Sequence, residues 1–355
     1  MPDQPRPNRR GHPKSDAPAT AELQRALELK LGRYFGMKRT IVGLERRPSP
    51  YRSSRRLDEL AVRFKDGESV RVLMKDLSPQ GVLNSARHAR PQFLHDPQRE
   101  VNAYRSILPG APPGTPAWYG TVVNGAANRS WLLLEDVEGE QLSQVGTLSA
   151  WKKTATWIGR LHSAYPASRA QRLATRSKLL LYDREFYWQW LRRAEQFCSR
   201  SARKRRMMNL VAQRYDRVVD RLMGLPRTII HGELYAGNVV IGRQHGKLRI
   251  CPVDWEMAAL GPGLVDLAAL SAGWDERHRQ LLARSYVSAC TPPGGRHVTW
   301  RTHVASGFDV DLDCCRLHLA VQMVGWSDNW SPPPQHARDW LSEAVKIADR
   351  LSRTG

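Results

Sequence analysis

The chain has 355 residues, of which 41% are hydrophobic and 25% are charged. This composition excludes a disordered, collagen-like or coiled-coil protein, and the length suffices to bury a core without disulfides or structural metals. Lysine and arginine number 55 against 34 aspartates and glutamates, so the formal net charge is +21. The surplus is concentrated in residues 46–56 and 192–206. It favours encounter with anions such as nucleotides, nucleic acid or acidic lipids, without defining the fold.

Three features of the sequence indicate a cytoplasmic protein without a membrane partner. The five cysteines form no CxxC pair, so we expect reduced thiols rather than a zinc site. Residues 1–20 are rich in proline and arginine and have no apolar run. They are predicted to form a disordered basic tail, not a secretory signal or membrane anchor. The longest uncharged stretch, residues 106–128, is interrupted by prolines and glycines, which excludes a membrane-spanning helix.

The first part of the chain combines two helices with short strands. Leucines recur every four residues from Leu23 to Leu31 and predict an amphipathic helix over 21–35. A second helix is predicted to begin at Asp96, an N-cap residue that is followed by proline. The turn Asp66-Gly67 predicts a hairpin between two of the strands. Strands are predicted over residues 40–44, 57–64, 69–77, 118–123 and 130–134.

Beyond residue 139 the pattern is mainly helical. Helices are predicted over residues 147–164, 182–197, 204–224, 264–274, 276–289, 312–325 and 335–351. Strands are predicted only over residues 228–230, 239–241 and 248–253. The sequence therefore predicts an α+β, bilobal fold, with a small antiparallel-sheet lobe over 21–138 followed by a larger helical lobe over 139–355.

The candidate chemistry lies in and after residues 228–241. Apolar strands flank a polar loop that carries Glu233 and Asn238, and Asp254 follows the next hairpin arm. We expect these three oxygen-bearing side chains to converge at adjacent strand ends. Magnesium binds hard oxygen ligands and keeps substrate phosphates among them, which suits Asn238 and Asp254. The pattern indicates Mg-dependent phosphoryl transfer, whereas an unrelated polar hairpin would have to place the three side chains by coincidence.

The motifs are specific enough to suggest a family. The runs His231-Gly-Glu-x-x-x-x-Asn238, Asp254-Trp-Glu256 and Gly261-Pro-Gly-Leu-Val-Asp266-Leu are spaced along the second lobe. Together they resemble those of the aminoglycoside phosphotransferase and choline kinase family, relatives of the protein kinases. The resemblance covers about residues 40–274. It implies a bilobal protein-kinase-like fold that binds ATP or GTP with Mg²⁺, together with a small-molecule acceptor.

The resemblance also implies roles for the matched residues. Glu233 would orient the acceptor hydroxyl or accept its proton, and Asn238 and Asp254 would hold Mg²⁺. Glu256 would serve a second metal or support the first set of ligands.

Two further matched residues are implied to act on the loop rather than on the substrate. Asp266 would brace the catalytic loop. His231 would support the same loop as a structural imidazole, an interpretation that we prefer to a proton shuttle.

Glu233 departs from the family pattern, which usually has aspartate at this position. The extra methylene moves the carboxylate by about 1.5 Å, and a misplacement of roughly 1 Å can cost a hundredfold in rate. The transition state of phosphoryl transfer is nevertheless loose, and the metal ion and the positioning of the reactants provide most of the catalysis. Two hypotheses therefore stand, an active small-molecule kinase and a nucleotide-binding pseudokinase or interaction module.

The nucleotide site is predicted from the first lobe. Lys75 ends a predicted strand and could reach the phosphates if Glu100, on the predicted helix, fixes its side chain. Taken alone, Lys75 would be one solvated lysine among many, and Glu100 an ordinary acid of a first helical turn. Asp136 and Val137 lie in a segment that resembles the hinge between kinase lobes, whose backbone would bind the adenine edge.

The loop over residues 47–54 would cover the phosphates in a kinase-like fold. It contains no glycine, and its two prolines remove backbone donors, so it weakly supports a backbone phosphate cradle. Arg52, Ser53 and Ser54 could contact phosphate with their side chains instead. A solvated basic loop fits the same residues.

The acceptor is not identified by motif. Residues 182–206 combine aromatic side chains with a cluster of seven cations over residues 192–206, which disfavours a polycationic aminoglycoside. The aromatic residues fit a pocket wall or ordinary helix packing. A third hypothesis, nucleic-acid association through the two arginine clusters, has compositional support only.

Overall fold

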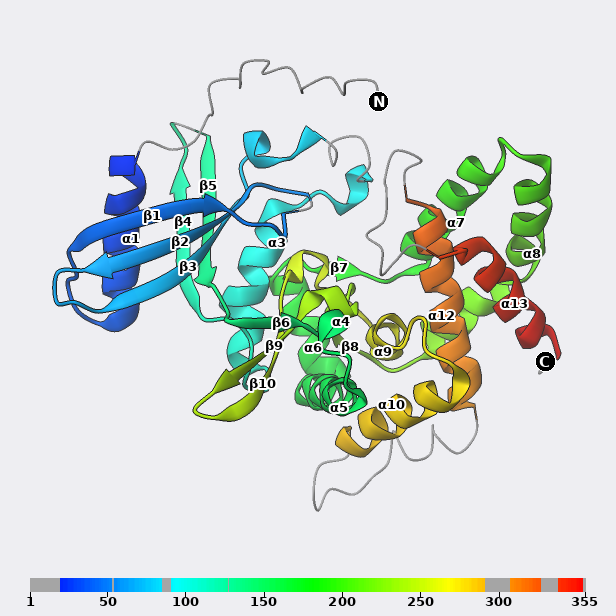
Figure 1. Ribbon diagram of the computed structural model, residues 1–355. Coiled ribbons are helices and arrows are strands. Elements are labelled where there is room, and N and C mark those ends of the chain that lie inside the picture. Colours follow the sequence, from blue (N-terminus) through cyan, green and yellow to red (C-terminus); the bar gives the residue numbers. More distant parts are fainter. Residues whose placement is uncertain are drawn as a thin grey trace, which may run out of the picture.

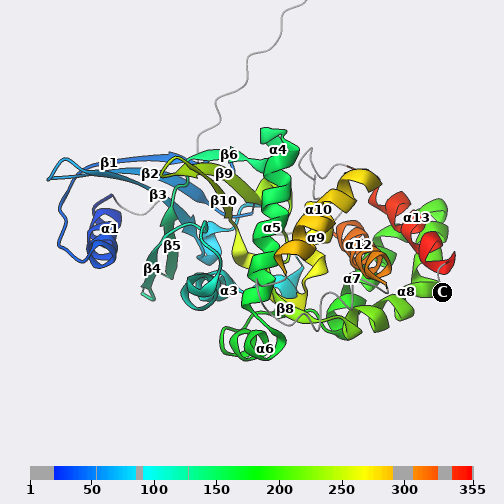
Figure 2. The ribbon, with the colours of Figure 1, turned by 90° about the horizontal axis from the view of Figure 1, so that it is seen from below.

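The computed structural model describes residues 20–52, 54–84, 91–126, 128–290, 307–326 and 338–353. The predicted tail therefore lies outside the described residues, apart from Thr20, where the first helix begins. Ser53 lies outside them as well. The chain has the expected bilobal arrangement, in which a five-stranded sheet with helix α1 forms one end and α7, α8, α12 and α13 form the other (Figures 1 and 2).

The large sheet is antiparallel throughout and has the strand order β1-β2-β3-β5-β4. Its strands are β1 (Ile41–Pro48), β2 (Leu57–Phe64), β3 (Ser69–Asp76), β4 (Trp118–Asn124) and β5 (Arg129–Glu135). Helix α1 (Thr20–Phe35) buries the predicted leucines Leu23, Leu27 and Leu31 in one cluster with the sheet residues Val62 and Phe64. This apolar stripe holds α1 on one face of the sheet.

The opposite side of the sheet continues into the main core. The helix predicted at Asp96 is α3 (Pro97–Asn102), and the Asp96 carboxylate accepts a hydrogen bond of 2.9 Å from the backbone N–H of Gln98. One π-helical turn, Ala103–Ile107, follows. Val101 and Tyr104 on this segment belong to the core that extends through the helical lobe, so α3 packs on both lobes and can carry Glu100 to the space between them.

The second lobe is mainly helical and contains two small sheets. Its helices are α4 (Leu142–Val145), α5 (Leu148–Ala164), α6 (Ala167–Arg176), α7 (Arg184–Cys198), α8 (Ala202–Gly224), α9 (Leu264–Leu270), α10 (Glu276–Ala289), α12 (Phe308–Val324) and α13 (Trp340–Arg353). One sheet has the order β10-β9-β6, and the other β7-β11-β8. These strands are β6 (Gly139–Gln141), β7 (Leu180–Leu181), β8 (Arg227–Ile230), β9 (Val239–Gln244), β10 (Lys247–Pro252) and β11 (Ala259–Pro262).

Several boundaries differ from the predictions. Strand β1 runs to Pro48 because it pairs with β2 along its length, and the helix predicted over 264–274 ends at Leu270. Helix α6 and the strands β6, β7 and β11 were not predicted. The strands are two to four residues long, too short for a periodic signal. The helix predicted over 335–351 is α13, and residues 335–337 lie outside the described range.

The five cysteines Cys198, Cys251, Cys290, Cys314 and Cys315 are free and buried, as expected for reduced thiols. Burial raises the pKa of the Cys251 thiol to about 12. None of the helices built from the described residues has the length and apolar character needed to cross a bilayer.

Candidate active site

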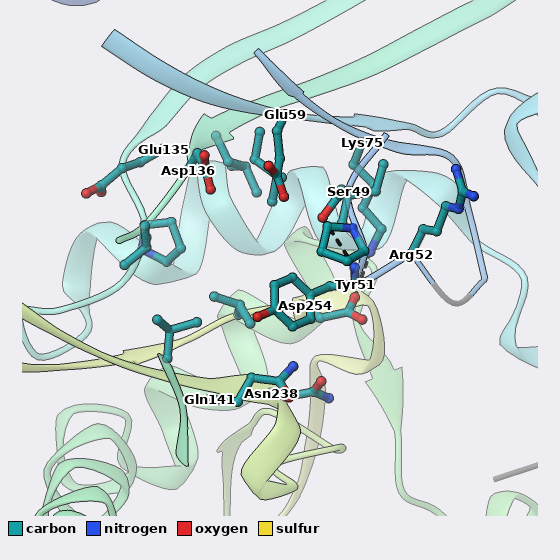
Figure 3. Close-up of a pocket in the computed structure, with 18 of the residues that line it drawn as sticks. Ser49, Tyr51, Arg52, Glu59, Lys75, Glu135, Asp136, Gln141, Asn238 and Asp254 are labelled. Carbon is teal, nitrogen blue, oxygen red and sulfur yellow. Dashed lines mark hydrogen bonds and ion pairs between the residues drawn. The ribbon is translucent and has the colours of Figure 1, made fainter. Parts of the chain in front are cut away.

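A cavity of about 600 Å³ lies between the five-stranded sheet and the loops of the second lobe. Strands β1 to β3, the loop between β1 and β2, and residues 135–139 contribute one wall. Asn238 and Asp254 contribute to the other, and Figure 3 shows Lys75 reaching across toward Asp254. The cavity thus brings Lys75 of the first lobe together with Asn238 and Asp254 of the second lobe.

Lys75 lies at the centre of an acidic cluster. Its Nζ is 2.7 Å from Oε2 of Glu100, 2.6 Å from Oδ1 of Asp254 and 3.7 Å from Oε2 of Glu256. Both carboxylates line the cavity, but the Glu100 side chain is 3% exposed, whereas that of Asp254 is 30% exposed. Glu100 therefore fixes the lysine from the more buried side, and Asp254 is the carboxylate that solvent and ligands reach more easily.

The charges of this cluster shift one another's pKa values. Burial lowers the pKa of Lys75, but the carboxylates of Asp254, Glu100 and Glu256 outweigh it, and the net pKa is raised. Burial raises the pKa of the Glu100 carboxyl to about 7, against the opposing attraction of Lys75. Lys75 is thus a permanent cation that is shared among more negative charge than it neutralises.

Asp266 braces the loop before Glu233. Its two carboxylate oxygens accept hydrogen bonds from the backbone N–H groups of His231 (2.8 Å) and Gly232 (2.9 Å), and the His162 ring lies 3.2 Å away. Asp266 is fully buried. Gly232 has a φ of 84°, and a Cβ there would approach the Met257 carbonyl oxygen to 2.3 Å. The sequence His-Gly-Glu therefore needs glycine at its centre.

His231 is a structural imidazole. Its Nε2 lies 2.8 Å from the Val253 carbonyl oxygen, which can only accept, so Nε2 carries the proton. Its Nδ1 accepts the backbone N–H of Glu233 at 3.3 Å. Burial lowers the pKa of His231, which favours this neutral form. The His231 ring therefore connects the loop that carries Glu233 with Val253, the residue before Asp254.

Asn238 and Asp254 are fixed side by side by backbone hydrogen bonds. The Val253 N–H donates to the Asn238 carbonyl at 2.9 Å, and the Asn238 Nδ2 donates to the Glu233 carbonyl at 2.9 Å. The amide oxygen of Asn238 is therefore the atom left for the cavity. Asp254 has a left-handed backbone (φ 63°, ψ 65°), an unusual conformation for a residue other than glycine.

The three side chains expected to converge, those of Glu233, Asn238 and Asp254, do not all line the same cavity. Glu233 is half-buried but does not line the cavity that contains Asn238 and Asp254. Burial, and then the charge of the Glu233 carboxylate, raise the pKa of the Tyr235 phenol. Glu256 points its carboxylate at Lys75 rather than lining the cavity. Of the three side chains expected to converge, Asn238 and Asp254 therefore line the cavity and Glu233 does not.

The hinge candidates Asp136 and Val137 line the cavity, as does Ser54. Arg71 donates two hydrogen bonds, of 2.9 and 2.6 Å, to Asp136 Oδ2. The first arginine cluster is partly neutralised within the sheet, because Arg46 pairs with Asp58 at 2.6 Å and Arg47 with Glu59 at 2.7 Å. Because Arg46 and Arg47 are paired with acids, they attract an external anion less strongly than two unpaired arginines would.

Arg249 on β10 was missed by sequence reasoning. Its guanidinium forms a two-point ion pair with Glu135, at 2.5 and 2.8 Å, just before the hinge. It also donates to the carbonyls of Gly114 (2.9 Å) and Thr115 (2.8 Å) in the other lobe. Arg249 thus links the strand that leads to Asp254 with Glu135, which directly precedes the hinge candidates Asp136 and Val137. No local pattern marks an arginine whose partners lie more than 100 residues away.

The comparison with protein families agrees with the geometry. The profile described as "phosphotransferase enzyme family" matches residues 58–297, well over half of the chain. The chain belongs to the phosphotransferase enzyme family. No curated protein matches the sequence.

Solved structures of phosphotransferases share the fold at low sequence identity. Macrolide 2'-phosphotransferase from Brachybacterium faecium is 14% identical with a TM-score of 0.52, covering 92% of this chain and 97% of its own. The GDP complex of aminoglycoside 2'-phosphotransferase-IIIa is 11% identical with a TM-score of 0.55, with coverages of 93% and 99%. Spectinomycin phosphotransferase with ADP and spectinomycin is 13% identical with a TM-score of 0.52, with coverages of 95% and 100%. These matches show the protein-kinase-like fold.

The phosphotransferase cavity fits a magnesium ion chemically. Asp254 and Asn238 offer a carboxylate and an amide oxygen to the same space, and these are hard donors. Glu100, Asp254 and Glu256 also have oxygens within 4.8 Å of one another, but Lys75 binds this group. Asp254 and Asn238 are therefore the better candidates to hold the metal.

Proposed function

We propose that this protein transfers the γ-phosphoryl group of ATP or GTP to a hydroxyl or amine of a small molecule, with Mg²⁺ as cofactor. The observation that carries the proposal is the placement of Lys75, Asn238 and Asp254 around one cavity between the lobes. Membership of the phosphotransferase family supports it.

Residues 21–138 would bind the nucleotide, and residues 139–355 would carry the catalytic loop and the acceptor. The hinge backbone at Asp136 and Val137 would meet the base, which places the phosphates toward Lys75. Neighbouring structures bind GDP and ADP, so either base is compatible with the fold. Lys75, held by Glu100, would neutralise phosphate charge.

Asn238 and Asp254 would hold Mg²⁺, which would offset charge on the phosphates. Asn238 is suited to this because its Nδ2 already donates to the Glu233 carbonyl. Asp254 would have to exchange part of its contact with Lys75 for the metal. Glu256 remains a candidate for indirect support of this site.

Glu233 would orient the acceptor hydroxyl and take up its proton. The acceptor oxygen would form a bond to the γ-phosphorus while the bond to the β,γ-bridging oxygen breaks, which releases ADP or GDP. The backbone N–H of Glu233 is held by His231 and that of Gly232 by Asp266, so the loop is fixed before substrate arrives. The longer glutamate side chain would reach an acceptor seated slightly farther from the loop than aspartate could.

The test measures Mg-ATP and Mg-GTP turnover over a panel of hydroxyl and amine acceptors, alongside nucleotide affinity. We expect Glu233→Ala to lower turnover by about a hundredfold or more while leaving nucleotide affinity unchanged. Glu45→Ala, an exposed glutamate on β1, is the matched control. Equal turnover by wild type and Glu233→Ala would exclude Glu233 as the base.

The alternative is a nucleotide-binding pseudokinase. Tight binding of Mg-nucleotide without transfer to any acceptor of the panel would favour that reading, because Glu233 replaces the family's usual aspartate. Transfer to any one acceptor that is lost in Glu233→Ala would exclude it.

A further inference from the structure

A second pocket lies between helix α7 and residues 92–93, outside the cavity described above. It is an open hollow of about 560 Å³. Its lining consists of Gln92, Phe93, Gln189, Arg192, Arg193 and Gln196. The lining therefore offers amides, one aromatic ring and two guanidinium groups, and no carboxylate.

Helix α7 builds one wall of this pocket. Gln189, Arg192, Arg193 and Gln196 follow the spacing of one helical stripe. The neighbouring α7 residues Phe186 and Trp190 are buried in the core and fix the helix. The Phe93 ring packs edge-on against Trp190, at 5.4 Å between ring centroids, and closes the pocket from the opposite side. The pocket is thus held by core contacts.

Arg193 is the unusual residue of the stripe. It is half-buried, and its Nε donates to the Gly325 carbonyl at 3.0 Å. No carboxylate pairs with it among the residues that the structure describes, whereas Arg192 pairs with Glu185. Burial lowers the pKa of Arg193, as expected where no anion offsets the lost hydration. Its two terminal amino groups remain to bind an anion.

Aromatic side chains in contact with one another lead from Phe93, at the pocket, to the loop that carries Glu233. Phe93 packs against Phe186 at 6.1 Å, and Phe186 against Tyr182 at 4.1 Å between ring centroids. The Tyr182 hydroxyl donates to the Gly232 carbonyl at 3.4 Å, next to Glu233. Buried aromatic contacts therefore connect Phe93, at the pocket, with the backbone next to Glu233.

We propose that this pocket, with Arg193 at its centre, binds a carboxylate or phosphate group of the phosphoryl acceptor, so that the acceptor is an anionic hydroxyl compound. This inference rests on the proposed function, because it assigns the bound molecule as the phosphoryl acceptor. The glutamines would bind its neutral polar groups, and Phe93 would pack against its apolar part. A polycationic acceptor is disfavoured here because the lining brings two positive charges and no negative one.

The closing experiment measures binding by calorimetry without nucleotide. Three probes share a phenol ring and differ in charge: 4-hydroxyphenylacetate, its methyl ester, and tyramine. A fourth, 4-hydroxyphenyl phosphate, tells a phosphate preference from a carboxylate preference. We expect the anions to bind about ten- to a hundredfold more tightly than the ester or tyramine. Equal binding, preference for tyramine, or no binding by any probe would overturn the proposal.

Variants locate the effect in the pocket. Arg193→Gln should abolish the preference for anions, and Arg193→Lys should keep part of it. Arg205→Gln removes the same charge from an exposed position of α8 and should leave the preference unchanged. Thermal unfolding checks that each variant folds. A preference for anions that survives in Arg193→Gln would refute the assignment.

A second variant does not depend on removing Arg193. Gln92 is exposed, so Gln92→Glu should fold and should shift the preference toward tyramine. An unchanged preference would count against the pocket. Because these measurements need no turnover, they separate this inference from the proposed function: a protein that binds anions at Arg193 but transfers no phosphoryl group would contradict only the latter.

Discussion

The Asp254 carboxylate lies 2.6 Å from the ammonium of Lys75, as close as the carboxylate of Glu100 at 2.7 Å. Both acids line the cavity, but the Glu100 side chain is only 3% exposed whereas that of Asp254 is 30% exposed. With Glu256 nearby, one cation faces three carboxylates. A divalent cation at Asp254 would relieve this excess of negative charge, so metal and lysine act on the same carboxylate.

Replacing Lys75 tests this balance. Lys75→Met leaves the carboxylates without their buried cation, and we expect the free energy of unfolding at pH 8 to fall by about 3 kcal/mol. The loss should be smaller at pH 6, because the Glu100 pKa, about 7 in the wild type, rises further without Lys75, and protonated Glu100 no longer repels the neighbouring carboxylates. Urea denaturation at both pH values measures the difference, with the exposed Lys153→Met as control. An equal loss at both would show that Glu100 does not titrate there.

Asp266 is predicted to matter for loop geometry. In Asp266→Asn, one of the two oxygens that accept the N–H groups of His231 and Gly232 becomes an amide donor. We expect the free energy of unfolding to fall by about 2–3 kcal/mol, because a buried N–H loses its acceptor. Phosphotransfer, once an acceptor is known, should fall further than nucleotide affinity. Asp349→Asn, at an exposed position, should change neither quantity.

The Arg249 contact predicts a coupling between stability and nucleotide affinity. Lysine cannot reproduce its two-point pairing with Glu135 together with the bonds to Gly114 and Thr115. Arg249→Lys should lower the free energy of unfolding by about 2 kcal/mol and weaken nucleotide binding, because the hinge loses its anchor. Arg243→Lys, exposed on the same hairpin, is the control. Unchanged nucleotide affinity would limit Arg249 to a structural role.

His318 predicts how stability responds to acid. Burial lowers its pKa to about 3, and its Nδ1 pairs with the Tyr215 hydroxyl at 2.9 Å. Between pH 6.5 and about 3 the unfolded chain binds a proton that the folded protein excludes, so stability falls as pH falls through this range. The slope is about 1.4 kcal/mol per pH unit for one proton.

His318→Gln should remove that contribution. Urea denaturation at pH 7, 6 and 5 would show the wild type losing its advantage over the variant as pH decreases. His245→Asn, an exposed histidine, should keep the wild-type slope. Parallel curves for wild type and His318→Gln would contradict the prediction.

The order of strands and helices, and the pairing of Lys75 with Glu100, could be predicted because each leaves a local or spaced pattern. Other features left none. Strand β7 exists because it pairs with β11, not because two leucines favour a strand. Arg71 meets Asp136 across 65 positions of sequence. The position of the Glu233 carboxylate depends on how the loop is fixed by Asp266, which spacing alone does not determine. The lobe boundary at residue 138 stays a prediction, and β6 begins at Gly139.

The burial of every cysteine provides an internal probe of local opening. A thiol with a pKa near 12 is almost entirely protonated at neutral pH, and its enclosure excludes alkylating reagents. Modification therefore waits for the surrounding structure to open, and its rate reports the free energy of that opening. Cys251 on β10 lies three residues before Asp254, while Cys314 and Cys315 lie on α12. Mass spectrometry of the labelled chain would thus measure the opening of β10 and of helix α12 separately, without any engineered label.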